Sequence, residues 1–113
     1  MATLEAVEEA VQGLVERLAD VDPELRRKYA VERTVSCRLR DLDVILLASV
    51  DEDGAISAVT HAQRGDGQVK LTTSSDDLIA LIEGRLAVPT AWATGKLKID
   101  ASMLDLLKLR SLF

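Results

Sequence analysis

Residues 74–113 read SSDDLIALIEGRLAVPTAWATGKLKIDASMLDLLKLRSLF. Two strongly apolar segments in this stretch are joined by a short strand pattern, and the stretch contains no catalytic constellation. Ser74 and Asp77 have the spacing of a capping box, and Gly84 stands where a left-handed C-terminal cap is wanted. We therefore predict a short helix over residues 76–83. This combination favours the binding of an apolar ligand over catalysis.

A last helix is predicted over residues 103–113, because Ser102 and Asp105 repeat the start signal and seven of the eleven residues that follow Ser102 are apolar. Such a helix cannot be solvated on all sides. It is either plain core or the wall of a ligand site, and its periodicity does not separate the two. Pro89 begins or kinks a short helix within residues 87–92, a segment that could act as a mobile lid.

Apolar residues near the N-terminus recur three and four apart, which predicts a helix over residues 4–21 with one apolar stripe. The stripe must dock on the sheet or on a second copy of the chain. Asp22 and Pro23 give the start signal of a further helix that ends near Ala30.

From Val31 the apolar period changes to two, with Arg33 as the one exception. The pattern predicts five strands over residues 31–40, 42–50, 55–62, 69–73 and 96–99. Gly65-Asp66-Gly67 is expected to turn the third strand into the fourth. We predict a single domain over residues 1–113, of the α+β class, with a mostly antiparallel five-stranded meander covered on one face by helices.

The composition of the chain limits the classes of function that it can have. The chain has 113 residues, 48% apolar but 3% aromatic, so its interior must be aliphatic. A net charge of −5 argues against nucleic acid as a partner. The glutamate-rich start is unlike a signal or transit peptide, and the longest apolar run, Val44–Ala48, is far too short to span a bilayer. We expect a cytoplasmic protein with no stable membrane insertion.

Few residues of the chain have side chains suited to catalysis or metal binding. The chain has one cysteine and one histidine, which excludes an internal disulfide and predicts no metal site and no cofactor. His61 has no paired base or nucleophile nearby in the sequence, so a surface or hydrogen-bonded role is expected for it. Cys37 falls on the apolar face of its strand, where an inert thiol is the default. Thr94-Gly95-Lys96 lacks the other residues of a phosphate loop. We therefore expect no enzyme.

Three elements of the 74–113 stretch carry a family resemblance: Gly84-Arg85, Ala91-Trp92, and Gly95-Lys96-Leu97-Lys98-Ile99, followed by Met103. They resemble the C-terminal signature of the sterol carrier protein family, small lipid-carrying domains. That family often has Gly and Asp before its last helix, where this chain has Ala101 and Ser102.

The resemblance implies an apolar tunnel between the sheet and the C-terminal helices. Its lining would come from the apolar side chains of the signature, with Leu109 as a further candidate on the last helix. The ligand-binding residues implied are Leu78, Leu81, Ile82, Leu86, Trp92, Leu97, Ile99, Met103, Leu106 and Leu107.

Two features stay open on sequence alone. Trp92 either lies at the rim of a cavity or fills a gap beneath the Pro89 turn. The basic cluster Arg26-Arg27-Lys28 is either a solvated helix face or a contact for an anionic headgroup, a coenzyme A phosphate or a membrane surface.

Our first functional hypothesis is the non-catalytic binding or carriage of an apolar lipid, such as a fatty acid, an acyl-CoA or a sterol-like molecule. The alternative is an interaction module with a collapsed cavity that forms a homodimer or docks on a partner enzyme.

Overall fold

A computed structural model describes residues 2–22, 24, 32–52 and 55–111 of the chain. The described helices and strands are α1 (Leu4–Ala19), β1 (Arg33–Leu39), β2 (Val44–Val50), β3 (Ile56–Ala62), β4 (Val69–Thr73), α3 (Ser75–Glu83), α4 (Val88–Ala93), β5 (Lys98–Asp100) and α5 (Met103–Ser111). They are grouped along the chain as expected of an α+β domain, with β1 to β4 in succession before α3 and α4.

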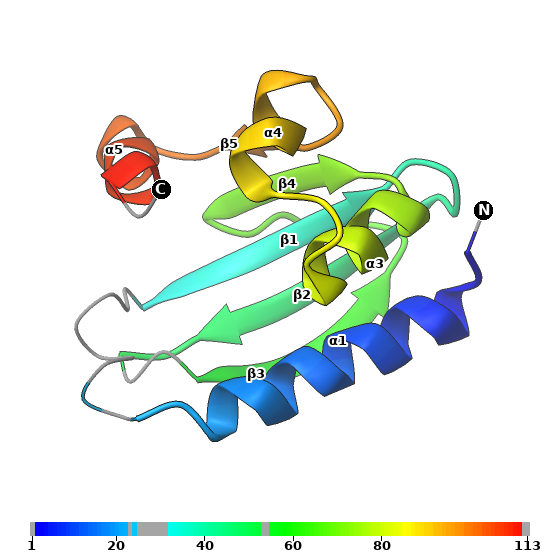
Figure 1. The fold of residues 1–113 in the computed structure, drawn as a ribbon, viewed down its shortest axis with the longest axis horizontal. Helices are drawn as coiled ribbons and strands as arrows, with labels where there is room; N and C mark the ends of the chain where they lie inside the picture. The colour runs from blue at the N-terminus through cyan, green and yellow to red at the C-terminus, as the bar shows by residue number, and fades with distance from the viewer. Residues whose placement is uncertain (1, 23, 25–31, 53–54, 112–113) are drawn as a thin grey trace.

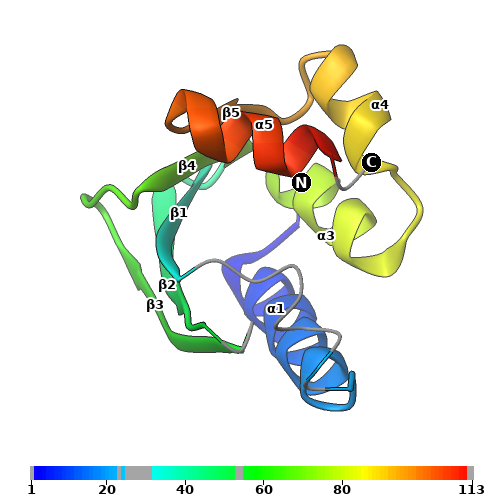
Figure 2. The ribbon, with the colours of Figure 1, turned by 90° about the vertical axis from the view of Figure 1, so that its left-hand side faces the viewer.

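The strands form one sheet in the order β3-β2-β1-β4-β5 (Figure 1). The β1–β2, β2–β3 and β4–β5 pairs are antiparallel, whereas β1 and β4 are parallel. Helices α1, α3 and α4 lie on one side of this sheet (Figure 2). The predicted fold class is therefore confirmed, with one correction: the sheet is mixed and is not a simple meander.

The correction concerns the segment between β3 and β4. Residues 63–68 do not close a hairpin at Gly65-Asp66-Gly67 as predicted, because β4 pairs with β1. The segment crosses the sheet face that points away from the helices. Gly65 lies against the Leu47 side chain, and a Cβ on Gly67 would come within 2.7 Å of the Ser36 nitrogen. Only glycine leaves room for so close a crossing of β1.

The hydrophobic core lies between the other face of the sheet and α1. Leu46, Cys37 and Leu71 pair across neighbouring strands, so their side chains form one row on this inner face. Val7 of α1 is fully buried against this region. The apolar stripe of the N-terminal helix thus docks on the sheet of the same chain.

Capping signals set the helix boundaries. The Ser74 hydroxyl accepts a hydrogen bond from the Asp77 N–H at 3.2 Å, and Gly84 ends α3 with φ 80°. These are the two caps predicted for this helix, and α3 starts one residue before the predicted position. Pro89 lies in the first turn of α4, as its fixed φ favours.

Several predicted elements differ in extent: the N-terminal helix ends at Ala19, and β1, β2 and β3 begin at Arg33, Val44 and Ile56. β5 begins at Lys98 and not at residue 96, because the Lys96 carbonyl accepts from the Thr73 hydroxyl and the Leu97 N–H donates to Ala91. Of the helix predicted after Asp22, the structure describes Glu24, whose N–H donates to the Asp22 carboxylate at 3.0 Å. The remainder of that helix, with the basic cluster at 26–28, lies outside the described residues.

Ser75, at the start of α3, joins three parts of the chain that are distant in sequence. It is fully buried, and both its N–H and its hydroxyl donate to the Asp41 carboxylate in the β1–β2 turn. The Ala2 N–H donates to the same hydroxyl. Desolvation raises the pKa of Asp41, but the hydrogen bonds from Ser75 outweigh it and leave that pKa below its ordinary value. This junction fixes the N-terminus of α1 beside α3.

Burial raises the pKa of the Cys37 thiol to about 11. We expect this thiol to react slowly with maleimide at pH 8 in the folded protein and rapidly once the chain unfolds. Since the unfolded thiol ionises near its ordinary value of 9.0, the stability contributed by the neutral thiol should be fully present below that pH and lost as pH rises toward about 11. The measurement is the unfolding free energy against pH, compared with Cys37→Ala. A native thiol that reacts as fast as the unfolded one would contradict the buried placement.

Candidate functional site

The inner face of the sheet has two unequal halves. At the end of β1, Cys37 and Leu39 are buried, as is Leu46 beside them. At the start of β1, Val35 and its paired neighbours Ala48 and Val69 are only half-buried. This second group, which we call the half-buried end of the sheet, leaves apolar surface of the inner face uncovered.

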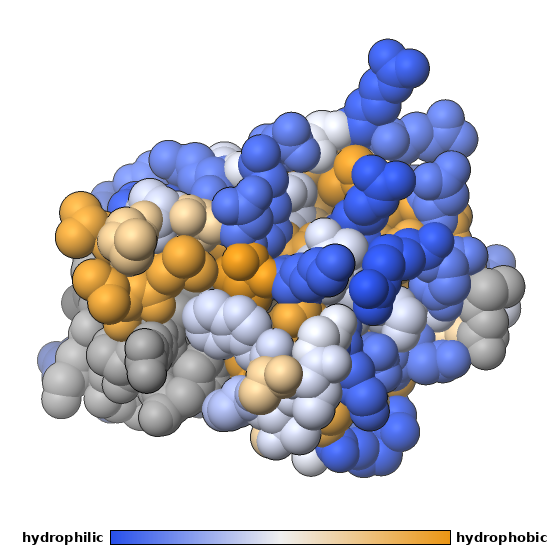
Figure 3. Space-filling model, turned by 90° about the horizontal axis from the view of Figure 1, so that it is seen from above, coloured by the Kyte–Doolittle hydropathy of each residue, from blue (hydrophilic) through white to orange (hydrophobic). Residues whose placement is uncertain are grey.

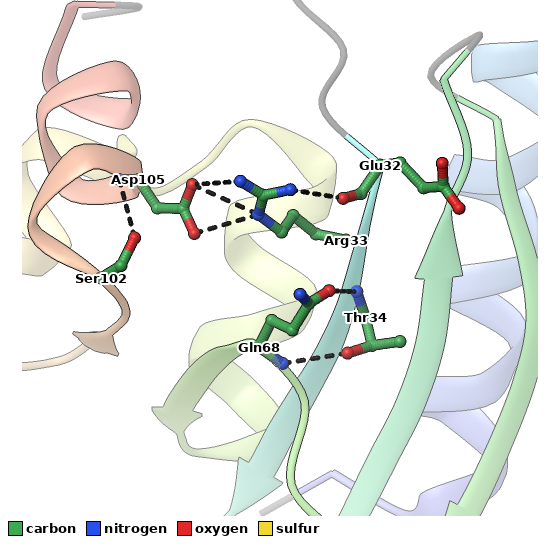
Figure 4. Close-up of polar contacts among 6 residues, drawn as sticks. All are labelled: Glu32, Arg33, Thr34, Gln68, Ser102 and Asp105. Atoms are coloured by element: carbon green, nitrogen blue, oxygen red, sulfur yellow. Dashed lines mark hydrogen bonds and ion pairs between the residues drawn. The ribbon is translucent and has the colours of Figure 1, made fainter.

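An ion pair between Arg33 and Asp105 attaches helix α5 beside this end of the sheet (Figure 4). The Arg33 Nε donates to Asp105 Oδ2 at 3.1 Å, and its Nη2 donates to Oδ1 at 3.1 Å. A further bond runs from Arg33 Nη1 to the Glu32 carbonyl oxygen at 2.7 Å. The bidentate geometry fixes the guanidinium and carboxylate planes relative to each other.

This pair lies at the boundary between protein and solvent. The Arg33 side chain is 35% exposed, whereas that of Asp105 is 10% exposed. The hydrogen bonds that Arg33 donates to Asp105 raise the pKa of Arg33 further above its already high value, so the guanidinium stays charged. The cation therefore remains available to hold the acidic side chain that α5 presents to the sheet.

The sequence analysis did not assign this contact, although it contains the signal for it. Arg33 is the exception in the apolar alternation of β1, and it shares the inner face with Val35 and Cys37. Asp105 is the acidic residue within the apolar last helix. A charge on an apolar strand face requires a partner of opposite charge, and the first acidic residue of an apolar helix is a candidate.

The short chain segment before α5 is also anchored. The Thr73 hydroxyl donates to the Lys96 carbonyl at 2.9 Å, and Leu97 is 5% exposed. The Ser102 hydroxyl then accepts from the Asp105 N–H at 3.2 Å, which is the predicted cap of the last helix. The start of α5 is thus held from both sides, at the sheet edge and through Asp105.

The ten residues predicted to contact a ligand fall into three groups. Leu97 is buried, and Leu78 packs against the main core cluster. Half-buried positions on α3, α4, β5 and α5 make up the second group: Leu81, Ile82, Leu86, Trp92, Ile99 and Leu106. The third group, Met103 and Leu107, is 73% and 56% exposed. The side chain of Leu109 lies outside the described part of α5.

Ile99 is the member of this set whose position on the sheet is fixed by strand pairing. It lies opposite Leu71 on the inner face, at the edge strand nearest α5. Trp92 lies on α4, half-buried. Of these half-buried residues, Ile99 therefore lies on the inner face of the sheet.

Helix α5 also carries exposed apolar side chains, which gather over it in the view from above (Figure 3). Met103, Leu104 and Leu107 are 73%, 75% and 56% exposed. The helix is therefore not plain core over its described length. Leu104 was not among the predicted contact residues, because apolar residues all round a helix do not reveal which side faces outward.

The one histidine of the chain pairs with an acidic residue at the edge of the sheet. His61 Nδ1 lies 3.0 Å from Glu8 of α1, an exposed pair at the β3 edge. Within the described residues no group of three His, Cys, Asp or Glu side chains could hold a metal ion. None of the described helices has the length and apolar character needed to cross a membrane.

The sequence matches the SCP-2 sterol transfer family over residues 4–113. No curated protein matches it.

Solved structures share the fold. Sterol carrier protein 2 like 2 from Aedes aegypti superposes with a TM-score of 0.64 and 20% identity, covering 96% of this chain and 97% of that one. The palmitated form of that protein gives 0.61 and 17%, covering 98% and 94%. The sec-alkylsulfatase Pisa1 from Pseudomonas gives 0.57 and 18%, covering 76% of this chain but only 13% of the enzyme. At these identities the structures establish the fold alone, and it is the family match that assigns the sequence: this chain belongs to the SCP-2 sterol transfer family.

Proposed function

We propose that this protein binds and carries an apolar lipid, without catalysing a reaction on it. The observation that carries the proposal is the difference between the two halves of the sheet's inner face. One half is buried under α1, whereas Val35, Ala48 and Val69 are half-buried beside a helix attached through Arg33 and Asp105. Membership of the SCP-2 sterol transfer family supports the same function.

The ligand would lie between the inner face of the sheet and the C-terminal helices. Half-buried Ile99 and Leu106, together with Trp92, would contact it. Binding would come from apolar burial, about 25 cal/mol for each Å² removed from water. A fatty acid, an acyl-CoA and a sterol-like molecule all offer such surface, and the palmitated relative from Aedes aegypti is consistent with an acyl chain.

Native mass spectrometry of gently purified protein, combined with organic extraction, tests the proposal. We expect either a co-purified lipid or uptake of an added fatty acid, acyl-CoA or sterol at one molecule per chain. A mass corresponding to the bare chain, with no uptake of any of the three, would reject lipid carriage.

Trp92 provides an optical test of where the ligand lies. Since it is half-buried on α4, a ligand that contacts it should move its indole from partial water contact to apolar contact and shift its emission to shorter wavelength. The measurement is tryptophan fluorescence during titration with a saturated fatty acid. An unchanged spectrum at saturation, with binding proven by mass spectrometry, would remove Trp92 from the proposed contact set.

A second candidate function is an accessory interaction module that forms a homodimer or docks on an enzyme. The exposed apolar residues of α5 favour it. Light scattering at several protein concentrations separates the candidates, because a stable dimer with no lipid uptake would support the module. Both functions suit a cytoplasmic protein, which is the location we propose.

A further inference from the structure

The ion pair between Arg33 and Asp105 lies on the same side of the sheet as the proposed lipid site. Arg33 precedes Val35 by two positions on β1, so both side chains belong to the inner face. Asp105 reaches the guanidinium from α5, and the next residue of that helix, Leu106, is half-buried. The Arg33 side chain is partly exposed, whereas that of Asp105 is nearly buried. The pair therefore lies at the rim of the half-buried end of the sheet, where the headgroup of a lipid covering that end would meet solvent.

The hydrogen bonds of Arg33 are directed at the chain itself. Each of the three guanidinium nitrogens donates to an acceptor: Nε and Nη2 to the Asp105 carboxylate, and Nη1 to the Glu32 carbonyl oxygen (Figure 4). A lipid carboxylate that bound the guanidinium in bidentate fashion would have to displace Asp105. That displacement would take the cation away from a carboxylate whose side chain is only 10% exposed, which is strongly unfavourable.

The charge at this rim is negative. The hydrogen bond to Asp105 raises the pKa of Arg33, and the charges of Asp105 and Glu32 raise it as well, against the desolvation that lowers it. Both carboxylates therefore act on the same guanidinium. One cation and two carboxylates give these three residues a net charge of −1. An anionic headgroup placed beside them would be repelled, whereas an uncharged headgroup would not.

From this geometry we propose that the Arg33–Asp105 pair determines the specificity of the lipid site and selects an uncharged lipid, with a hydroxyl or an ester as its head, over a free fatty acid. The inference rests on the proposed function and names the class of ligand within it. A sterol-like alcohol and an acyl ester both belong to this class, because each joins an apolar body to a neutral polar head.

A competition between two lipids of the same chain length tests the inference. The protein is incubated with equal amounts of dodecanol and laurate at pH 8, where laurate is ionised. Gel filtration removes the unbound lipid, and organic extraction recovers the bound lipid. Because the two chains match, the dodecanol-to-laurate ratio in the extract reports the effect of the headgroup. We expect the wild type to retain several-fold more dodecanol than laurate.

Variants of the pair make the test specific, because any apolar site prefers a hydroxyl to a carboxylate. Asp105→Asn keeps an oxygen that accepts from Arg33 but removes the negative charge, so the ratio should fall about tenfold, on the scale of one charge-assisted contact. Arg33→Gln removes the cation and should raise the ratio above that of the wild type. Asp100→Asn is the matched control, since Asp100 is exposed on the other face of the sheet, and it should keep the wild-type ratio.

The total lipid recovered and the ratio keep the two proposals apart. A loosened α5 would lower the uptake of both lipids and leave the ratio unchanged, so opposite shifts in Asp105→Asn and Arg33→Gln identify an effect of charge. If the wild type retains more laurate than dodecanol, or if both variants keep the wild-type ratio, the inference is overturned and lipid carriage stands. If the wild type retains neither lipid, carriage fails and the inference fails with it.

Discussion

Replacement of Leu39 by alanine is expected to lower the free energy of unfolding by about 2–5 kcal/mol, which is a large part of the stability of a domain this size. Leu39 is 0% exposed. It lies on the interior strand β1 and belongs to the core cluster with Val7 and Leu46. Its truncation leaves a cavity that close-packed neighbours fill only in part. Urea denaturation followed by circular dichroism measures the loss.

Leu107→Ala is the matched control, since it removes the same atoms from a side chain that is 56% exposed. We expect its effect on stability to stay within about 0.5 kcal/mol, the range of ordinary surface substitutions. A loss equal to that of Leu39→Ala would mean that α5 is packed as core in solution, which would contradict an outward-facing patch.

Asp105→Ala is expected to release α5 from the sheet. The substitution leaves Arg33 without the carboxylate that accepts from Nε and Nη2. Amides of α5 should then exchange with solvent about tenfold faster, on the scale of one charge-assisted contact discounted for its exposure to water. Hydrogen exchange followed by mass spectrometry gives the rates for residues 103–111.

Two further variants make this test specific. Asp100→Ala removes an exposed carboxylate from β5 and should leave the exchange of α5 unchanged. The charge swap Arg33→Asp/Asp105→Arg should restore part of the protection, because it rebuilds an ion pair of opposite orientation. Equal exchange in Asp105→Ala and the parent would show that other contacts, and not this pair, hold the helix.

Local signals predicted the elements of the fold well. Ser74 and Ser102 both cap helices through the hydroxyl bonds that their spacing indicates, and Gly84 takes the left-handed conformation expected of it. These features depend on residues within four positions of one another. The resemblance of residues 84–103 to sterol carrier proteins was confirmed by the family match.

Long-range features were harder to predict. Pairing of β4 with β1 depends on a crossing that glycine permits at residue 67, and a Gly-Asp-Gly sequence is equally typical of a tight turn. The Arg33–Asp105 pair joins residues 72 positions apart, so no local period contains it. The sequence does not show which side of α5 faces outward, so the exposure of Leu104 was not predicted. Contact of the ten predicted residues with a ligand stays a prediction.

The crossing between β3 and β4 also bears on how the sheet is assembled. Joining β1 to β2, or β2 to β3, closes a short loop between neighbours in sequence. Joining β4 to β1 closes a loop of 34 residues, the separation of the hydrogen-bonded pair Thr34 and Gln68. Chain entropy opposes the longer closure more strongly, and such non-local contacts slow folding. β5 pairs with β4, and α5 follows β5 in the chain. The ordering of the C-terminal region therefore depends on the β4–β1 pairing, which has the largest entropic cost in the sheet.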